Sequence, residues 1–184
     1  MSSHDHQGTD LLVAGARYYP QAFVAIREYR RNIRDTWRKA LESHLANISK
    51  VMAISLDSDK LIDHAIPDSF RSSHASADWA QLGLKIKTPQ WRIYFLVEYE
   101  EEKTYMWIQL RVASEDNAQL VYEMLMKRLR RPFEIHRKKN VLALYREISP
   151  DQMRHLEKAC AQICDEWCFL WKGSGGLKKI ASKT

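Results

Sequence analysis

The sequence contains no run of about 18 apolar residues, the length that a membrane-spanning helix requires. Its first seven residues are rich in Ser, His and Asp, and they lack the basic and apolar segments of a secretory signal. Cysteine is scarce, because three residues crowded into one segment do not make a disulfide framework. Together these absences predict a cytoplasmic protein that has no membrane contact.

The common catalytic motifs are missing as well. No Gly-rich phosphate loop, nucleophile elbow or His–carboxylate arrangement is visible. Cys160, Cys164 and Cys168 share one helical face, but no second pair of ligands completes the half zinc site that they could provide. We therefore expect buried thiols, with no catalytic residue, no metal and no cofactor, and an enzyme is the least supported class.

Basic residues are in modest excess, since 29 Lys and Arg against 23 Asp and Glu give a formal net charge of +6. Four of the lysines follow Glu166, after which there is no acid, so the body of the chain is only mildly basic. The apolar share of 45% is sufficient for a hydrophobic core. The length predicts a single domain, which the sequence pattern places over 20–172. It leaves a flexible tail over 1–19 and a Gly/Ser-Lys tail over 173–184.

The clearest pattern lies in residues 91–112. Apolar residues occupy every second position from Trp91 to Tyr99 and again from Met106 to Val112, on either side of a Glu/Lys turn. Such alternation predicts two antiparallel strands with one buried and one outward face.

A two-residue loop at Glu101-Glu102 fixes the register of this hairpin. Leu96 then faces Trp107, and Arg92 faces Arg111. Like charges directly opposite one another repel, so the two arginines would need an anion or a shared acid. The outward face then also carries Tyr94, Leu96, Tyr105 and Trp107. Aromatic rings beside arginines on an open sheet can stack nucleic-acid bases, although the first helix could instead cover this face.

Helical patterns surround the hairpin. Apolar residues recur every three or four positions from Ala22 to Met52, which predicts a helix of roughly thirty residues. Ser114 predicts the N-cap of a second helix that runs to Arg131 and stops at Pro132. Ser149-Pro150 predicts the start of a last helix, which ends at the glycines after Lys172.

Two stretches complete the expected order. Residues 133–137 and 141–148 predict a second hairpin. Residues 57–89 predict a long connection with a short helix near Lys60 and a short strand at 84–87. The expected fold is a single α+β domain of the order α-β(β)β-α-β-β-α, with the long N-terminal helix and the C-terminal helix packed on an antiparallel sheet.

Over about residues 21–170, this order is similar to that of type III secretion chaperones, which run helix, three strands, helix, two strands, helix. The resemblance is one of topology and no motif carries it. It implies a protein-binding role. Those chaperones are typically acidic dimers, whereas this chain is basic.

Clusters of basic residues are the candidate binding sites. Arg27, Arg31, Arg34 and Arg38, spaced 4, 3 and 4, fall on one side of the first helix and could contact successive phosphates. A solvated face, partly neutralised by Asp35 and Glu42, is the other interpretation. Arg130 and Arg131 close the second helix, where the helix dipole favours cations, and Lys138 and Lys139 occupy the next turn.

Pro67-Asp68 and Glu101-Glu102-Lys103 resemble the Pro-Asp and Glu-x-Lys elements of restriction-endonuclease-like nucleases. The resemblance covers five residues and implies a Mg²⁺ site on adjacent strands. In this chain Glu101 and Lys103 fall at an expected hairpin tip, where their side chains would point into water.

The leading hypothesis is a non-catalytic protein that binds nucleic-acid phosphates, or a nucleic-acid-handling complex, through clustered Arg and Lys. The expected contact residues are Arg27, Arg31, Arg34, Arg38, Arg92, Arg111, Arg130, Arg131, Lys138 and Lys139, with Tyr94, Tyr105 and Trp107 as the stacking or partner face. The alternative is a protein-binding adaptor, chaperone or inhibitor that uses the hairpin face or the first helix and contacts an acidic protein surface. A divalent-metal nuclease is the third hypothesis, and a homo-oligomer is compatible with each of them.

Overall fold

The computed structural model describes residues 3–66, 79–88, 90–100 and 103–177. The chain divides into a first unit, Met1–Asn32, and a second unit, Ile33–Thr184. Helix α1 (Ser3–Met52) supplies the described part of the first unit and continues into the second. The sheet and every other helix of the described residues belong to the second unit.

Helix α1 begins at Ser3, well before the start that the sequence predicted after Pro20. The segment expected as a tail over 1–19 is therefore helical from Ser3 onward. Leu11, Leu12 and Ala14 are good helix formers, which favours helix before the proline. The helix continues through Pro20, although an internal proline removes a backbone hydrogen bond and costs about 3 kcal/mol.

The second unit is built on a six-stranded antiparallel sheet in the order β1-β2-β3-β4-β6-β5. This arrangement confirms the predicted α+β fold and both predicted hairpins. The strands are β1 (Ile62–Ile66), β2 (Trp79–Lys87), β3 (Arg92–Glu100), β4 (Lys103–Arg111), β5 (Glu134–Lys138) and β6 (Val141–Glu147).

The connection that the sequence predicted over residues 57–89 contains more structure than expected. The short helix near Lys60 is confirmed as the 3-10 helix η1 (Ser58–Lys60). The strand expected at 84–87 is the end of the longer strand β2, which pairs along its whole length with β3. Strand β1 was not predicted, because Asp63 and His64 interrupt any apolar alternation in an edge strand whose Ile62 is 53% exposed.

The predicted register of the first hairpin is correct. Leu96 pairs with Trp107 and Arg92 pairs with Arg111, while Glu100 and Lys103 form the last pair before the loop. The loop residues 101–102 themselves lie outside the described residues. Because side chains alternate between the two faces of a strand, this register decides which residues of β3 and β4 share a face.

Helix α2 (Glu115–Met126) begins at the predicted cap, since the Ser114 hydroxyl accepts a hydrogen bond from the Asn117 amide at 3.2 Å. It ends at Met126, five residues before the predicted end at Arg131. A proline restricts only the residue before it, here Arg131, so Pro132 does not account for this earlier end. In the remaining turn, the Phe133 amide bonds to the Arg130 carbonyl at 3.1 Å.

The last helix is divided in two. Helix α3 (Pro150–Arg154) starts with the predicted capping box of Ser149 and Gln152. The backbone leaves helical geometry at His155, with φ −119° and ψ 42°, and α4 (Leu156–Trp171) follows. The segment from Gly173 ends α4 as predicted, because Gly173 adopts φ 75°, which glycine tolerates best.

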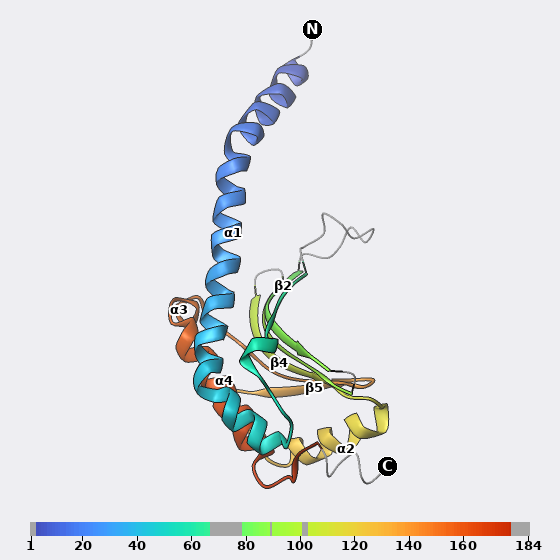
Figure 1. The fold of residues 1–184 in the computed structure, drawn as a ribbon. Coiled ribbons are helices and arrows are strands. Elements are labelled where there is room, and N and C mark those ends of the chain that lie inside the picture. The colour runs from blue at the N-terminus through green and yellow to red at the C-terminus, as the bar shows by residue number, and fades with distance from the viewer. Residues whose placement is uncertain (1–2, 67–78, 89, 101–102, 178–184) are drawn as a thin grey trace. The chain divides into compact units, whose positions relative to one another are not determined.

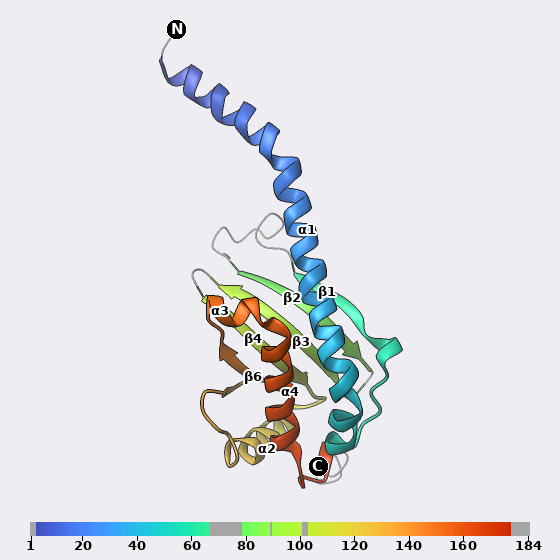
Figure 2. The ribbon, with the colours of Figure 1, turned by 90° about the vertical axis from the view of Figure 1, so that its left-hand side faces the viewer.

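One face of the sheet is covered by helices. Helix α4 and the part of α1 that follows Asn32 run side by side across it (Figure 2), and His44 contacts Asp165 at 3.2 Å between them. The fully buried Trp37 of α1 packs on Phe95 of β3, with ring centroids 5.8 Å apart. Each such buried side chain contributes roughly 1.5–3 kcal/mol to stability. These contacts place the core between the sheet and the two helices.

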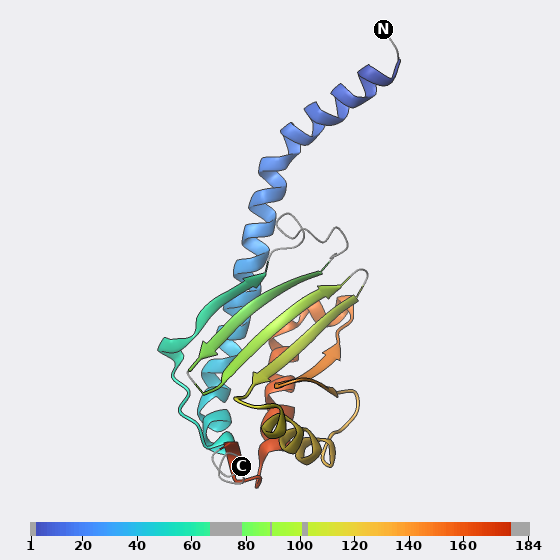
Figure 3. The ribbon, with the colours of Figure 1, turned by 90° about the vertical axis from the view of Figure 1, so that its right-hand side faces the viewer.

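The opposite face of the sheet is not crossed by any described helix of the second unit (Figures 1 and 3). Helix α2 lies past the end of the sheet at which β4 ends. Within the second unit, α1 therefore does not cover the face of Tyr94 and Trp107, as one interpretation of the sequence had allowed. That face carries the candidate site.

Candidate functional site

The uncovered face of the sheet is defined by the strand register. In β4, Met106, Ile108 and Leu110 point into the core, so the alternate residues point the other way. Directly opposite residues in antiparallel strands share a face, which extends the assignment across the sheet. We call this surface the open face, and its central residues are Lys85, Lys87, Arg92, Tyr94, Leu96, Tyr105, Trp107, Gln109, Arg111, His136, Lys138 and Tyr145.

Four cations lie in one line across one end of the open face. Lys87 pairs with Arg92, and Arg92 pairs with Arg111. Val141 pairs with both Arg111 and Lys138, which places Lys138 two strands from Arg111. Strands are spaced about 4.8 Å apart, so this basic row (Lys87, Arg92, Arg111 and Lys138) spans roughly 20 Å.

The two arginines in the middle of the basic row lack an acidic partner. Among the described residues, no carboxylate lies within ion-pair distance of Arg92 or Arg111. Both side chains line a polar pocket of about 270 Å³ together with Gln90 and Asn140. Two uncompensated guanidiniums on neighbouring strands repel each other, and an anion between them would relieve that repulsion.

An aromatic cluster lies farther along the same face. The rings of Trp107 and Tyr145 stack with centroids 4.6 Å apart at 20°. Tyr105 lies 6.3 Å from Trp107 and 6.0 Å from Tyr145, and His136 lies 4.3 Å from Tyr145. Tyr105 and Trp107 are partly exposed, so both can contact a ligand without rearrangement of the sheet.

The Tyr145 hydroxyl holds the cluster in place. It donates to Glu134 at 2.5 Å and lies 2.7 Å from His136 Nε2. Burial, followed by the bond to Glu134, raises the pKa of Tyr145 well above its usual range. The phenol therefore stays protonated at physiological pH and acts as a fixed donor.

The acidic side chains at the other end of the open face are already engaged. Glu98 accepts a hydrogen bond from Gln81 at 3.1 Å, and Glu147 pairs with Lys103 at 3.2 Å. Lys103 belongs to the segment that resembles the Glu-x-Lys element of nucleases, and in this structure its ammonium group forms this surface ion pair. The carboxylates of that motif, Asp68 and Glu101, lie outside the described residues.

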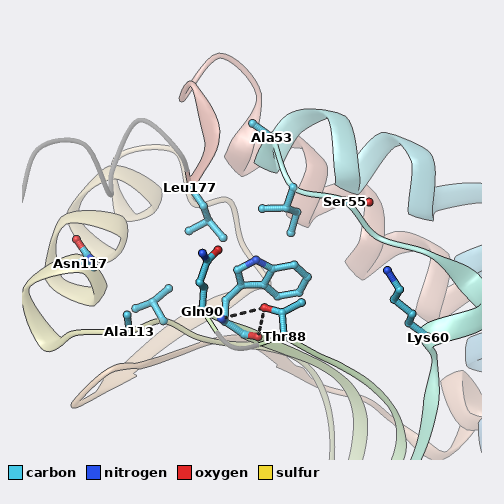
Figure 4. Close-up of a pocket in the computed structure, with 11 residues that line it drawn as sticks. Ala53, Ser55, Lys60, Thr88, Gln90, Ala113, Asn117 and Leu177 are labelled. Carbon is cyan, nitrogen blue, oxygen red and sulfur yellow. Dashed lines mark hydrogen bonds between the residues drawn. The ribbon is translucent and has the colours of Figure 1, made fainter.

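An apolar cavity of about 540 Å³ adjoins the basic row (Figure 4). It is open on one side and is lined by residues after α1, between β2 and β3, at the start of α2 and after α4. Its lining residues are Ala53, Ile54, Ser55, Lys60, Thr88, Gln90, Trp91, Val112, Ala113, Asn117 and Leu177. The sequence did not indicate this cavity, because its walls come from four separate segments.

The predicted arginine cluster of α1 is divided between the two units, and one of its members is paired with acids. Arg27 and Arg31 are exposed in the first unit, and Arg38 is partly exposed in the second. Arg34 pairs with Asp35 at 3.3 Å and with Asp63 of β1 at 2.8 Å, which raises its pKa above its ordinary value. The absence of an acid four residues after Arg34 had suggested a free cation, but β1 supplies the partner.

The predicted basic residues near Pro132 are also separated. Arg130 pairs with the buried Glu166 of α4, so its charge is compensated. Arg131 is exposed at the start of β5, whereas Lys138 and Lys139 lie at the opposite end of that strand. Lys138 joins Arg92 and Arg111 instead, and the exposed Lys139 follows it in the turn.

The predicted stacking residues all lie on the open face. Tyr94 is partly exposed and meets His64 edge-on, with ring centroids 5.2 Å apart. Sequence reasoning missed Lys87, His136 and Tyr145, which join this face only through pairing of β2, β5 and β6. The alternation within each strand indicates which of its side chains share a face, but the sequence does not reveal the order of the strands in the sheet.

The three cysteines are buried, as the sequence predicted. Burial raises the pKa of Cys168 to about 11 and raises the pKa values of Cys160 and Cys164 further above the ordinary range. In the part of the chain that the structure describes, no group of His, Cys, Asp or Glu could hold a metal ion.

No family model, no curated protein sequence and no solved structure matches this chain. Within the described ranges, none of the helices combines the length and apolar character needed to cross a bilayer.

Proposed function

We propose that the protein binds single-stranded nucleic acid across the open face and does not transform it. The observation that carries this proposal is the direct opposition of Arg92 and Arg111 without a compensating carboxylate among the described residues. Each backbone phosphate of a nucleic acid carries one negative charge and two non-bridging acceptor oxygens, and guanidinium groups bind it with well-directed hydrogen bonds.

The aromatic side chains support a single strand over a duplex. Tyr94 lies two residues from Arg92, and Trp107 lies four residues from Arg111, which corresponds to roughly 7 and 13 Å along the strands. Unpaired bases can stack on such rings, whereas the bases of a duplex are already stacked on one another. The basic row would then contact the backbone while the aromatic cluster contacts bases.

A salt titration with a labelled oligonucleotide tests the proposal. Binding to single strands loses about 0.7 logarithmic units of affinity per tenfold increase in salt for each phosphate that is neutralised. Four cations in the basic row predict a slope of about −3. Absence of binding to both single-stranded DNA and RNA at low salt would overturn the proposal.

Paired variants locate the contact. Arg92→Gln/Arg111→Gln should make the slope shallower by about 1.4. The matched control, Lys39→Gln/Lys158→Gln, removes the same charge from two exposed positions on the helices. It should change the slope by less than about 0.3, which is roughly half of the change expected for one phosphate contact.

A third variant tests the stacking contacts. Trp107→Leu should lower affinity by about 1–3 kcal/mol at constant salt slope. An acidic protein that binds the same arginines after nuclease treatment would instead support the adaptor role.

A further inference from the structure

The apolar cavity beside the basic row has the properties of a site for a small molecule. Its volume of about 540 Å³ is within the range of roughly 300–1,000 Å³ that is usual for such sites. Ile54, Trp91, Val112 and Leu177 supply apolar walls. A few polar groups, among them Gln90, also line it (Figure 4).

The cavity adjoins the polar pocket of the two arginines. The two hollows share the lining residues Thr88, Gln90, Trp91, Val112 and Ala113. Beyond these shared residues, the smaller pocket is also lined by Arg92, Arg111 and Asn140. An apolar space therefore lies directly beside two like charges that have no described counter-ion.

Hydrogen bonds hold the shared lining residues in place. Thr88 bonds to Trp91 in both directions, with its hydroxyl 2.9 Å from the Trp91 carbonyl and 3.1 Å from the Trp91 amide. The Asn140 side chain donates to the Val112 carbonyl at 2.8 Å, and the Val112 amide donates to the Asn140 carbonyl at 3.0 Å. A wall fixed in this way loses little conformational entropy when a ligand binds.

The opposite wall is fixed by close backbone packing. Gly176 adopts φ 71°, and a Cβ at this position would overlap the carbonyl of Met52 at the end of α1. Only glycine allows this approach, which brings the following Leu177 to the cavity. The cavity thus has preformed walls on both sides.

We infer that this pair of hollows binds a small amphipathic anion, with the apolar body in the 540 Å³ cavity and the carboxylate or phosphate group between Arg92 and Arg111. Charge complementarity and the apolar walls together select this class over neutral lipids and over small hydrophilic anions. The site shares the two arginines with the proposed nucleic-acid surface but not the aromatic cluster. Ligand and nucleic acid would therefore compete.

Calorimetric titration of the full chain with three probes tests the inference. Octanoate has both required parts, octanol lacks the charge and acetate lacks the apolar body. Octanoate should bind at least tenfold more tightly than either of the others. Equal affinity for octanol, or absence of octanoate binding at millimolar concentration, would overturn the inference. Octyl phosphate in place of octanoate distinguishes the two kinds of anionic group.

Two variants assign the binding to this place. Ala113→Phe adds volume at a residue that lines both hollows and should abolish octanoate binding. Arg92→Gln/Arg111→Gln should lower octanoate affinity about tenfold, equivalent to roughly 1.4 kcal/mol, and leave octanol unchanged.

A control variant separates this inference from the proposed function. Trp107→Leu should lower affinity for the oligonucleotide and not for octanoate. Octanoate binding that survives Ala113→Phe unchanged would contradict the inference whatever the result for nucleic acid. Circular dichroism melting of each variant establishes that it remains folded.

Discussion

The guanidinium of Arg130 donates two hydrogen bonds to a single oxygen of Glu166, of which the one from Nε measures 2.9 Å. Glu166 is only 2% exposed, and its second carboxylate oxygen has no partner among the described residues. Arg130 also lies over the ring of Phe169, 3.7 Å from its centroid. This ion pair connects the segment after α2 to α4. The charge of Arg130 therefore stabilises the packing of these two segments.

Loss of the Arg130 guanidinium should therefore destabilise the protein. Arg130→Gln leaves the buried carboxylate of Glu166 without its charged partner, which is more costly than the loss of an exposed ion pair. We expect a clear decrease in the urea midpoint. Arg131→Gln, at an exposed neighbouring position, is the control and should leave the midpoint unchanged. Equal midpoints for the two variants would show that the pair does not contribute.

Gly83→Ala should destabilise the sheet. Gly83 adopts φ 155°, and a Cβ at this position would overlap the backbone carbonyl of Phe95 on the neighbouring strand. We expect a loss of about 2 kcal/mol or more, because both backbone geometry and packing oppose the substitution.

Gly173→Ala provides the comparison for this prediction. Gly173 also has positive φ, at 75°, but an added Cβ would meet nothing within 4 Å. Its cost should be limited to about 1 kcal/mol for the backbone alone. Chemical unfolding of both variants measures the difference, and a larger loss for Gly173→Ala would contradict the packing argument.

The buried thiols should react slowly in the folded protein. Burial raises the pKa of Cys168 from 9.0 to about 11, so at pH 8 its thiolate fraction falls about a hundredfold. Cys160 and Cys164, whose pKa values are raised further, should react more slowly still. Alkylation kinetics with and without urea measure this ratio, and rapid labelling of all three in the native state would contradict it.

The same shift has a consequence for stability. The Cys168 thiol has a folded pKa above the unfolded value, so above about pH 9 the unfolded state loses its proton first. Stability attributable to Cys168 is complete below pH 9 and decreases as pH rises toward 11. Cys168→Ala should reduce this alkaline decrease, as unfolding curves at pH 8 and pH 10 would show.

His64 should contribute an acid-sensitive component of stability. Burial lowers the pKa of His64 below its ordinary value of 6.5, nearby Lys85 lowers it further, and a hydrogen bond that the imidazole donates to the Gln81 side chain opposes the shift. The unfolded state therefore binds a proton first as pH falls below about 6.5, and stability decreases there. His64→Gln should unfold with a weaker dependence on pH between 7 and 5, whereas His155→Gln, at an exposed position, should behave as wild type.

Local sequence patterns predicted the helices and strands whose characteristic residues lie within a single short segment. The alternation through Trp91 and Met106 predicted β3, β4 and their register, because apolar residues at every second position can bury only one face. Ser114 and Ser149 predicted two helix starts, since a cap needs only its own hydroxyl and the next turn. Strand β1 was not predicted, because an edge strand buries too little apolar surface to require alternating apolar residues.

The candidate site was predictable only in part. Arg92, Arg111 and Trp107 lie within one hairpin, and their common face follows from its register. Lys87 and Lys138 reach the same row through β2 and β5, whose places in the sheet no local pattern reveals.

The sequence by itself determined the α+β class, both hairpins and the opposition of Arg92 to Arg111, because these depend on side chains close together in the chain. The tertiary structure alone decided which cations have partners. Asp63 reaches Arg34 from 29 residues away and Glu166 reaches Arg130 from 36 residues away. Electrostatic energy depends on distance in space, so the charges available to a ligand are known only after the chain has folded.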